Sequence, residues 1–167
     1  MINSLGLLTR WLCFLIVVGL IFVVGRGMPI ADAQETDSLA LEQLVDNLFA
    51  AVNERRFAEL EKIYGEGSAL IAASQRPVVG LPEITEFWEM LLEESFKSID
   101  GRIEEIFVDE AHANALGSYS AILQIDGQNV SDQSTEDETA DGFFVIFFLK
   151  EEIGWLIKWH MWNAVFD

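Results

Sequence analysis

The apolar residues of this chain change their spacing once, from a helical pattern before residue 99 to long strand-like runs after it. The later runs are rich in Ile, Val, Phe, Trp and Tyr, which are enriched in β-strands. Four runs are expected as strands: Arg102–Asp109, His112–Ile125, Gly142–Lys150 and Trp155–Val165. Helices followed by strands within one short chain predict an α+β fold, with helices packed against a mainly antiparallel sheet.

The connections between these runs predict the order of the sheet. Asp109–Ala111 and Glu151–Gly154 are short enough for hairpins, so successive strands should be antiparallel neighbours. Phe143–Leu149 is apolar on both faces, which predicts a central strand covered on both sides. Residues 126–141 form a polar insertion with acidic side chains and no basic one, and we expect a hairpin loop there.

Three helices are expected before the strands. The first carries one apolar stripe, with Ser38 as its cap and a break at Asn53–Arg55. The stripe consists of Leu41, Leu44, Val45, Leu48, Phe49 and Val52. The third begins at Pro82, ends near Lys97 and places an apolar face inward. That face consists of Ile84, Phe87, Trp88, Leu91, Leu92 and Phe96.

Between these two helices we expect a short helix, a short strand and an edge segment. The helix would place Phe57, Leu60, Ile63 and Tyr64 on one side and stop at Gly65 and Gly67. The strand covers Ser68–Ala73. Arg76–Gly80 is a turn or sheet edge, because its proline cannot donate a hydrogen bond to a neighbouring strand.

Residues 1–33 have the pattern of an export signal. The uncharged apolar run Trp11–Gly25 lies between Arg10 and Arg26, and small residues precede an expected cleavage after Ala33. The run is short for a membrane-spanning helix, which favours export over anchoring. We therefore expect a periplasmic or secreted domain of residues 34–167, attached to a membrane only if the signal is not cleaved.

The charge and cysteine content exclude several classes of function. The chain has 28 acidic and 10 basic residues, a net charge of −18, which disfavours binding to nucleic acid or anionic lipid. The single cysteine lies within the expected signal, so the exported domain would have no thiolate nucleophile. Two histidines without a cysteine make a zinc site unexpected, and no cofactor is indicated.

Several segments, taken in order, resemble the NTF2-like superfamily and its SnoaL-like and DUF4440 branch. The segments are Leu48–Asn53, Ile63–Tyr64, Pro77–Gly80, Ile84–Trp88, Gly154–Ile157 and Trp162–Asn163. The resemblance implies a curved sheet that wraps against helices to form a cone. It also implies a functionally mixed superfamily that includes isomerases, dehydratases, cyclases and assembly subunits, so the fold does not define the activity.

The chain departs from the enzymes of that superfamily at one important position. The resemblance to the ketosteroid isomerases places their general-base aspartate near Ala72, and alanine cannot accept a proton. An acid that many DUF4440 relatives carry after the second helix falls near Gly67. Steroid-isomerase chemistry is therefore disfavoured.

His160 is the candidate catalytic residue, because an imidazole can transfer protons near neutral pH. Strict alternation along the last strand places Lys158, His160 and Trp162 on one face, and Ile157 with Trp159 on the other. Which face lines the cone stays open, and His160 also has a purely structural interpretation. The second imidazole, His112, begins a strand whose polar face, including Ser118 and Ser120, either lines a pocket or faces solvent.

Tyr64, Trp88, Tyr119 and Asn163 are the candidate ligand-pocket residues, because apolar pockets combine aromatic walls with a few polar groups. The expected function is binding of a small hydrophobic molecule in the cone. The alternatives are acid–base catalysis on such a molecule and a non-catalytic assembly module. The apolar β half also favours a homodimer.

Overall fold

The computed structural model describes residues 30–73, 75–124 and 138–164. The chain divides into two units, Met1–Glu35 and Thr36–Asp167, and the account below concerns the second. The expected signal lies outside the described residues except for its last four, and so does most of the polar insertion. None of the helices in the described ranges is both long and apolar enough to cross a membrane.

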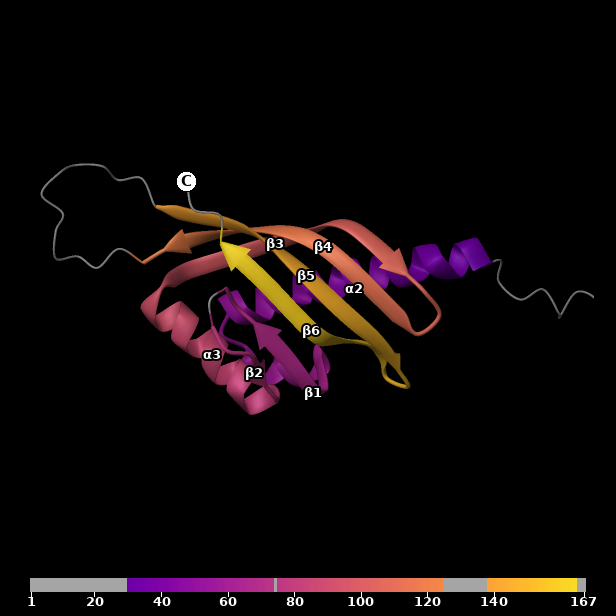
Figure 1. The fold of residues 1–167 in the computed structure, drawn as a ribbon, viewed down its shortest axis with the longest axis horizontal. Coiled ribbons are helices and arrows are strands. Elements are labelled where there is room, and N and C mark those ends of the chain that lie inside the picture. Colours follow the sequence, from indigo (N-terminus) through magenta and orange to yellow (C-terminus); the bar gives the residue numbers. More distant parts are fainter. Residues whose placement is uncertain (1–29, 74, 125–137, 165–167) are drawn as a thin grey trace, which may run out of the picture. The chain divides into compact units, whose positions relative to one another are not determined.

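The described strands form one six-stranded sheet in the order β2-β1-β6-β5-β4-β3 (Figure 1). The strands are β1 (Tyr64–Ile71), β2 (Val78–Val79), β3 (Phe96–Val108), β4 (His112–Leu123), β5 (Thr139–Glu151) and β6 (Gly154–Ala164). Strands β3 to β6 are successive antiparallel neighbours, as the short connections predicted, while β1 runs parallel to β6. The α+β prediction is confirmed, and so is the edge assignment of β2.

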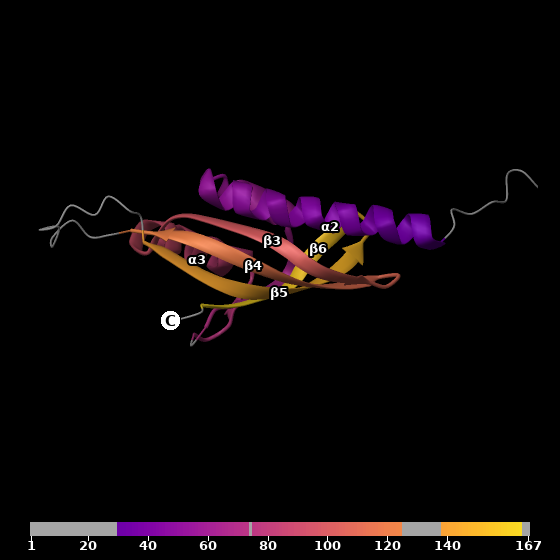
Figure 2. The same cartoon turned by 90° about the horizontal axis from the view of Figure 1, so that it is seen from above.

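Two α-helices and a short 3-10 helix accompany the sheet in the described ranges: α2 (Ile30–Asn53), η1 (Phe57–Lys62) and α3 (Leu81–Glu94). Figure 2 shows α2 lying along one face of the sheet. The predicted stripe of α2 is confirmed, because all its residues are buried except the half-buried Leu44. The helix begins before the predicted cap, since residues 30–37 contain no glycine or proline to stop it.

Other predicted boundaries are also wrong. Tyr64 starts strand β1 and pairs with Ile157, so Gly65 and Gly67 lie in a strand and do not terminate a helix. The apolar residues from Phe57 to Tyr64 have helical spacing, but the segment is short. This spacing is also compatible with a helical turn that is followed by a strand. α3 ends at Glu94, because the chain turns at Ser95 and Phe96 already pairs with Leu123 in the sheet. Residues 139–141 of the expected loop belong to β5.

The sheet has an inner face packed against the helices and an outer face that no described helix covers. On β5 the inner side chains Phe144, Ile146 and Phe148 are at most 1% exposed, whereas Phe143 is 51% and Val145 is 38% exposed on the outer face. The prediction that β5 is covered on both sides is therefore wrong for the single chain. Its apolar outer residues indicated burial, but both helices lie on the other side.

Two glycines allow aromatic rings to lie directly on the inner face. A Cβ at Gly101 would come 2.3 Å from the ring of Phe49 on α2, and a Cβ at Gly117 would come 2.0 Å from the ring of Phe144. These separations are too short for any other residue. The two rings pack with centroids 5.9 Å apart. Glycine at these positions thus lets α2 approach the sheet.

Asn53, the last residue of α2, holds the free edge of the sheet. Its Nδ2 donates to the carbonyl oxygen of Ile99, and its Oδ1 accepts from the Ile99 amide, both at 2.9 Å. Strand β3 is an edge strand, so these backbone groups have no neighbouring strand to bond. The amide side chain supplies both hydrogen bonds that a neighbouring strand would make.

The N-terminal half of α2 is held at the other end of the molecule by an ion pair. Lys150 Nζ lies 2.7 Å from Oδ1 of Asp37, and the indole nitrogen of Trp155 donates to the same oxygen at 2.9 Å. Partial burial acts to raise the pKa of the Asp37 carboxyl, but the bonds from Lys150 and Trp155 outweigh it and leave that pKa lowered. This contact ties α2 to the hairpin between β5 and β6.

Candidate functional site

A bulge in β6 decides which side chains share the face of His160. Phe147 pairs with Trp159 but Phe148 pairs with Ile157, so Lys158 is an extra residue in the ladder. Ile157 and His160 consequently both face inward, and Trp159 faces outward. The strict alternation expected from the sequence is therefore wrong across Lys158, because alternation cannot reveal a bulge.

Three of the predicted site residues form one buried hydrogen-bonded cluster. The hydroxyl oxygen of Tyr64 lies 3.0 Å from Nδ1 of His160, and Trp88 Nε1 donates to that oxygen at 3.3 Å. The three side chains come from β1, β6 and α3, and each is at most 3% exposed. All three side chains are therefore part of the buried core.

The hydrogen bonds determine where the protons lie. The Trp88 indole can only donate, so the Tyr64 oxygen accepts its hydrogen and the Tyr64 hydroxyl hydrogen needs another acceptor. Nδ1 of His160 is the acceptor within reach. His160 is therefore the neutral tautomer that carries its proton on Nε2.

Burial makes this imidazole a weak base. It lowers the pKa of His160 to about 3, because the charged form would lose its hydration. Burial also raises the pKa of Tyr64, against a smaller opposing effect of the Trp88 hydrogen bond. Among the described residues Ser68 is the only other buried polar or charged side chain in the core, so no buried carboxylate counters these effects.

An aromatic group continues from this cluster along the inner face. The Trp162 ring stacks on Trp88 with centroids 6.3 Å apart and meets Tyr119 edge-on at 5.3 Å. Phe87 and Phe96 meet Trp162 edge-on as well. The Trp162 indole nitrogen is buried and has no hydrogen-bond partner among the described residues. The interior expected to hold a ligand is thus largely filled by aromatic side chains here.

The two remaining predicted residues meet through the backbone. The Tyr119 hydroxyl donates to the carbonyl oxygen of Asn163 at 2.8 Å, and its ring passes over Gly142, where a Cβ would lie 2.5 Å from it. The Asn163 side chain is exposed and accepts a hydrogen bond from the Phe143 amide at 3.2 Å. Tyr119 therefore lies at the end of the buried cluster, while the Asn163 amide lies outside it.

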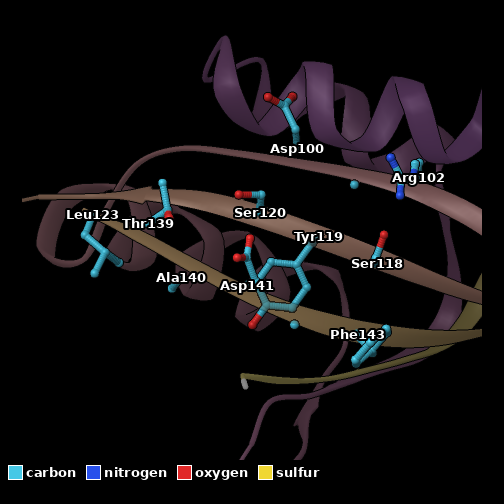
Figure 3. A pocket seen from close by; sticks show the side chains of 12 residues that line it. Asp100, Arg102, Ser118, Tyr119, Ser120, Leu123, Thr139, Ala140, Asp141 and Phe143 are labelled. Atoms are coloured by element: carbon cyan, nitrogen blue, oxygen red, sulfur yellow. The ribbon is translucent and has the colours of Figure 1, made fainter. Parts of the chain in front are cut away.

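A groove of about 930 Å³ opens at this end of the sheet, over strands β3, β4 and β5 (Figure 3). Its polar lining includes Asp100, Arg102, Ser118, Ser120, Thr139 and Asp141. Tyr119, Leu123 and Phe143 contribute apolar surface. Of the five predicted site residues, Tyr119 alone lines this groove. A second groove, of about 710 Å³, lies between α2 and the β5–β6 hairpin.

The groove side chains form two rows across neighbouring strands. Asp100, Ser120 and Asp141 are successive cross-strand partners, and so are Arg102, Ser118 and Phe143. Because these rows project from the face that no described helix covers, the groove belongs to the outer face (Figure 3). The polar alternation of β4 had indicated either a pocket or a solvent-facing surface there.

The two aspartates were not identified from the sequence. Asp141 fell in the acidic insertion, and Asp100 preceded the first expected strand. They become neighbours of Ser120 only through the strand register, which sequence spacing does not specify. Within residues 34–164, as far as they are described, no three His, Cys, Asp or Glu side chains come close enough to hold a metal ion.

Comparison with known proteins identifies the family. The model of the SnoaL-like domain matches residues 41–162, which is most of the chain. The chain belongs to the SnoaL-like domain family. This family has the NTF2-like fold, and its members typically bind small ligands or act as isomerases or dehydratases. No curated protein matches the sequence well enough to count as a relative.

Solved structures with low sequence identity share the fold of this SnoaL-like domain. An NTF2-like superfamily protein from Salmonella enterica matches with a TM-score of 0.63 at 12% identity, covering 80% of this chain and 94% of that one. A ketosteroid isomerase-like protein from Erwinia carotovora matches with 0.63 at 14%, covering 78% and 98%. An NTF2-like protein from Novosphingobium aromaticivorans matches with 0.63 at 11%, covering 83% and 92%. At these identities the likeness concerns the fold alone.

Proposed function

We propose that this SnoaL-like domain binds a small, largely apolar molecule and does not use His160 for catalysis. The observation that carries the proposal is the groove on the outer face, whose volume of about 930 Å³ suits a small organic molecule. Its lining combines an exposed Phe143 ring with hydroxyl and carboxylate groups. Such a mixture holds an apolar body and orients a polar group.

The state of His160 supports binding over proton transfer. A group with a pKa of about 3 is a poor general base near neutral pH, and at 2% exposure it cannot touch a molecule in the groove. The position near which the isomerases carry their aspartate is occupied by the buried Ala72. The cluster of Tyr64, Trp88 and His160 thus has the properties of a structural core.

A dye titration with matched tryptophan variants tests the groove. Ser120→Trp fills it, whereas Asn114→Trp adds the same ring on the same strand and face but outside the groove. Nile red, an uncharged apolar dye, should bind saturably to the wild type and to Asn114→Trp. Its affinity for Ser120→Trp should fall at least about tenfold. Absence of saturable binding, or equal loss in both variants with folding confirmed by circular dichroism, would contradict the proposal.

A second candidate is assembly into a homodimer through an outer apolar patch next to the groove. We define this patch as Leu116, Val145, Trp159 and Met161, which are 38–48% exposed on three neighbouring strands. Large contiguous apolar surfaces on a soluble domain commonly mark an interface. The patch favours pairing between copies, because the helices leave this face uncovered.

Light scattering on two charge variants tests the dimer. Val145→Glu places a charge in the outer apolar patch, whereas Leu39→Glu places one on α2 at a side chain that is 61% exposed. The wild type and Leu39→Glu should have the mass of two chains at micromolar concentration, and Val145→Glu that of one chain. A monomeric wild type would contradict the assembly.

A further inference from the structure

The charges that line the outer-face groove are unbalanced. The carboxylates of Asp100 and Asp141 form no ion pair and no side-chain hydrogen bond with any residue the structure describes. Arg102 is the only basic residue among the described residues of the lining, and its Nε lies 3.1 Å from Oε1 of Glu104. The groove therefore presents two carboxylates without a cation of their own.

The charge of the Arg102 guanidinium is offset by Glu104, which lies beside it. The Ser118 hydroxyl donates to the same Glu104 oxygen at 2.7 Å. Together the bonds from Ser118 and Arg102 lower the pKa of the Glu104 carboxyl, so it stays charged beside Arg102. An anionic ligand at Arg102 would therefore also be repelled by the carboxylate of Glu104.

Asp100 and Asp141 belong to the strands on either side of Ser120. Ser120 on β4 pairs with Asp100 on β3 and with Asp141 on β5, so all three project from one row of the outer face. Neighbouring strands are about 4.8 Å apart, which places the two aspartate backbones roughly 10 Å apart. The Asp141 carboxylate points toward the strand of Ser120, whereas that of Asp100 points away from it (Figure 3). A protonated amine donates up to three hydrogen bonds, which fits a position between the Asp141 carboxylate and the Ser120 hydroxyl, with Asp100 adding negative charge nearby.

The apolar surface lies one row away. Phe143 is two residues from Asp141, a distance of about 7 Å along the strand, and its ring is 51% exposed. A molecule with an amine at one end and a short apolar body would reach both rows. Its body would cover Phe143, and its charge would lie between Asp141 and Ser120.

The electrostatic field of the whole protein also favours a cationic ligand. The whole chain has a net charge of −18, which attracts cations and repels anions. Burial and the negative charge of Asp141 together raise the pKa of Tyr119 to about 12, so the field of this carboxylate reaches the floor of the groove.

We infer that the groove binds a small alkyl- or arylalkylamine, with its ammonium group held by Ser120 and Asp141, in the field of Asp100, and its apolar body on Phe143 (Figure 3). This inference rests on the proposed function, because it names the chemical class of ligand for the same groove.

Three probes with one phenyl group and different charges test the class of ligand. They are 2-phenylethylamine, its neutral counterpart 2-phenylethanol, and the anion 3-phenylpropanoate. Calorimetric titration of the full domain should give saturable binding of the amine, at least about tenfold weaker binding of the alcohol, and no binding of the anion. The amine affinity should also fall as salt is added.

Charge-removing variants locate the binding. The double variant Asp100→Asn and Asp141→Asn should weaken amine binding at least about tenfold, and Asp46→Asn, which removes an exposed charge on α2, should leave it unchanged. Equal loss in both variants would overturn the inference in favour of a general effect of net charge. Ser120→Trp should abolish amine binding.

The outcomes distinguish a wrong class of ligand from a groove that binds no ligand. If the alcohol binds as tightly as the amine and Nile red still requires an open groove, the inference fails and the proposed function stands. If neither the amine nor Nile red binds, both fail.

Discussion

The Tyr64 hydroxyl oxygen lies 3.0 Å from Nδ1 of His160, and both side chains are at most 3% exposed. Their sequence separation of 96 residues is bridged because β1 and β6 are parallel neighbours. The contact fixes His160 as a neutral hydrogen-bond acceptor inside the core. Burial therefore determines the acid–base behaviour of His160.

Acid should destabilise the protein through His160. The imidazole has a pKa of 6.5 in an unfolded chain and about 3 here, so between these values the unfolded state binds more protons. The contribution of His160 to stability is complete above pH 6.5 and decreases as the pH falls toward 3, by at most about 1.4 kcal/mol per pH unit. Denaturant unfolding of the wild type and of His160→Gln, compared at several pH values, measures it. A stability difference between the two that does not shrink below pH 6.5 would refute the prediction.

Removing the Tyr64 hydroxyl should lower the free energy of unfolding more than removing the Tyr119 hydroxyl. Tyr64→Phe leaves Nδ1 of His160 and Nε1 of Trp88 without a partner, at an expected cost of about 1–3 kcal/mol. Tyr119→Phe removes one bond to a backbone carbonyl and should cost about 0.5–1.5 kcal/mol. Urea denaturation checks the order, and a larger loss in Tyr119→Phe would contradict it.

The free edge of β3 should depend on both atoms of the Asn53 amide. Asn53→Asp can still accept from the Ile99 amide but cannot donate to its carbonyl oxygen, and Asn53→Ala can do neither. We expect a loss of about 1–3 kcal/mol in Asn53→Ala and increased amide exchange at Ile99. Unchanged exchange in both variants would show that the edge is held by other contacts.

Trp88 should be a principal packing residue of α3. It is 1% exposed and contacts Tyr64, His160 and Trp162, so Trp88→Ala should cost about 3–5 kcal/mol. Met90 on the same helix is 40% exposed, and Met90→Ala should change stability by less than about 0.5 kcal/mol. Thermal unfolding distinguishes them, and similar melting temperatures would contradict the packing role.

Particular residues show where sequence periodicity predicts the structure correctly and where it does not. The stripe from Leu41 to Val52 was predicted because one helix keeps a fixed period over twelve residues. The faces of β6 were partly mispredicted because the extra residue at Lys158 reverses the alternation. The segment from Phe57 to Tyr64 was too short to separate a helical turn from the start of a strand.

The sequence alone determined the α+β class, the antiparallel order of the last four strands and the candidate importance of His160 and Trp88. These follow from local patterns and short connections, in which neighbouring residues constrain one another. The tertiary structure decided that His160 is buried in contact with the Tyr64 hydroxyl, and that Asp100, Ser120 and Asp141 line one groove. Register and bulges set these contacts, because they depend on the packing of strands that are distant in the sequence.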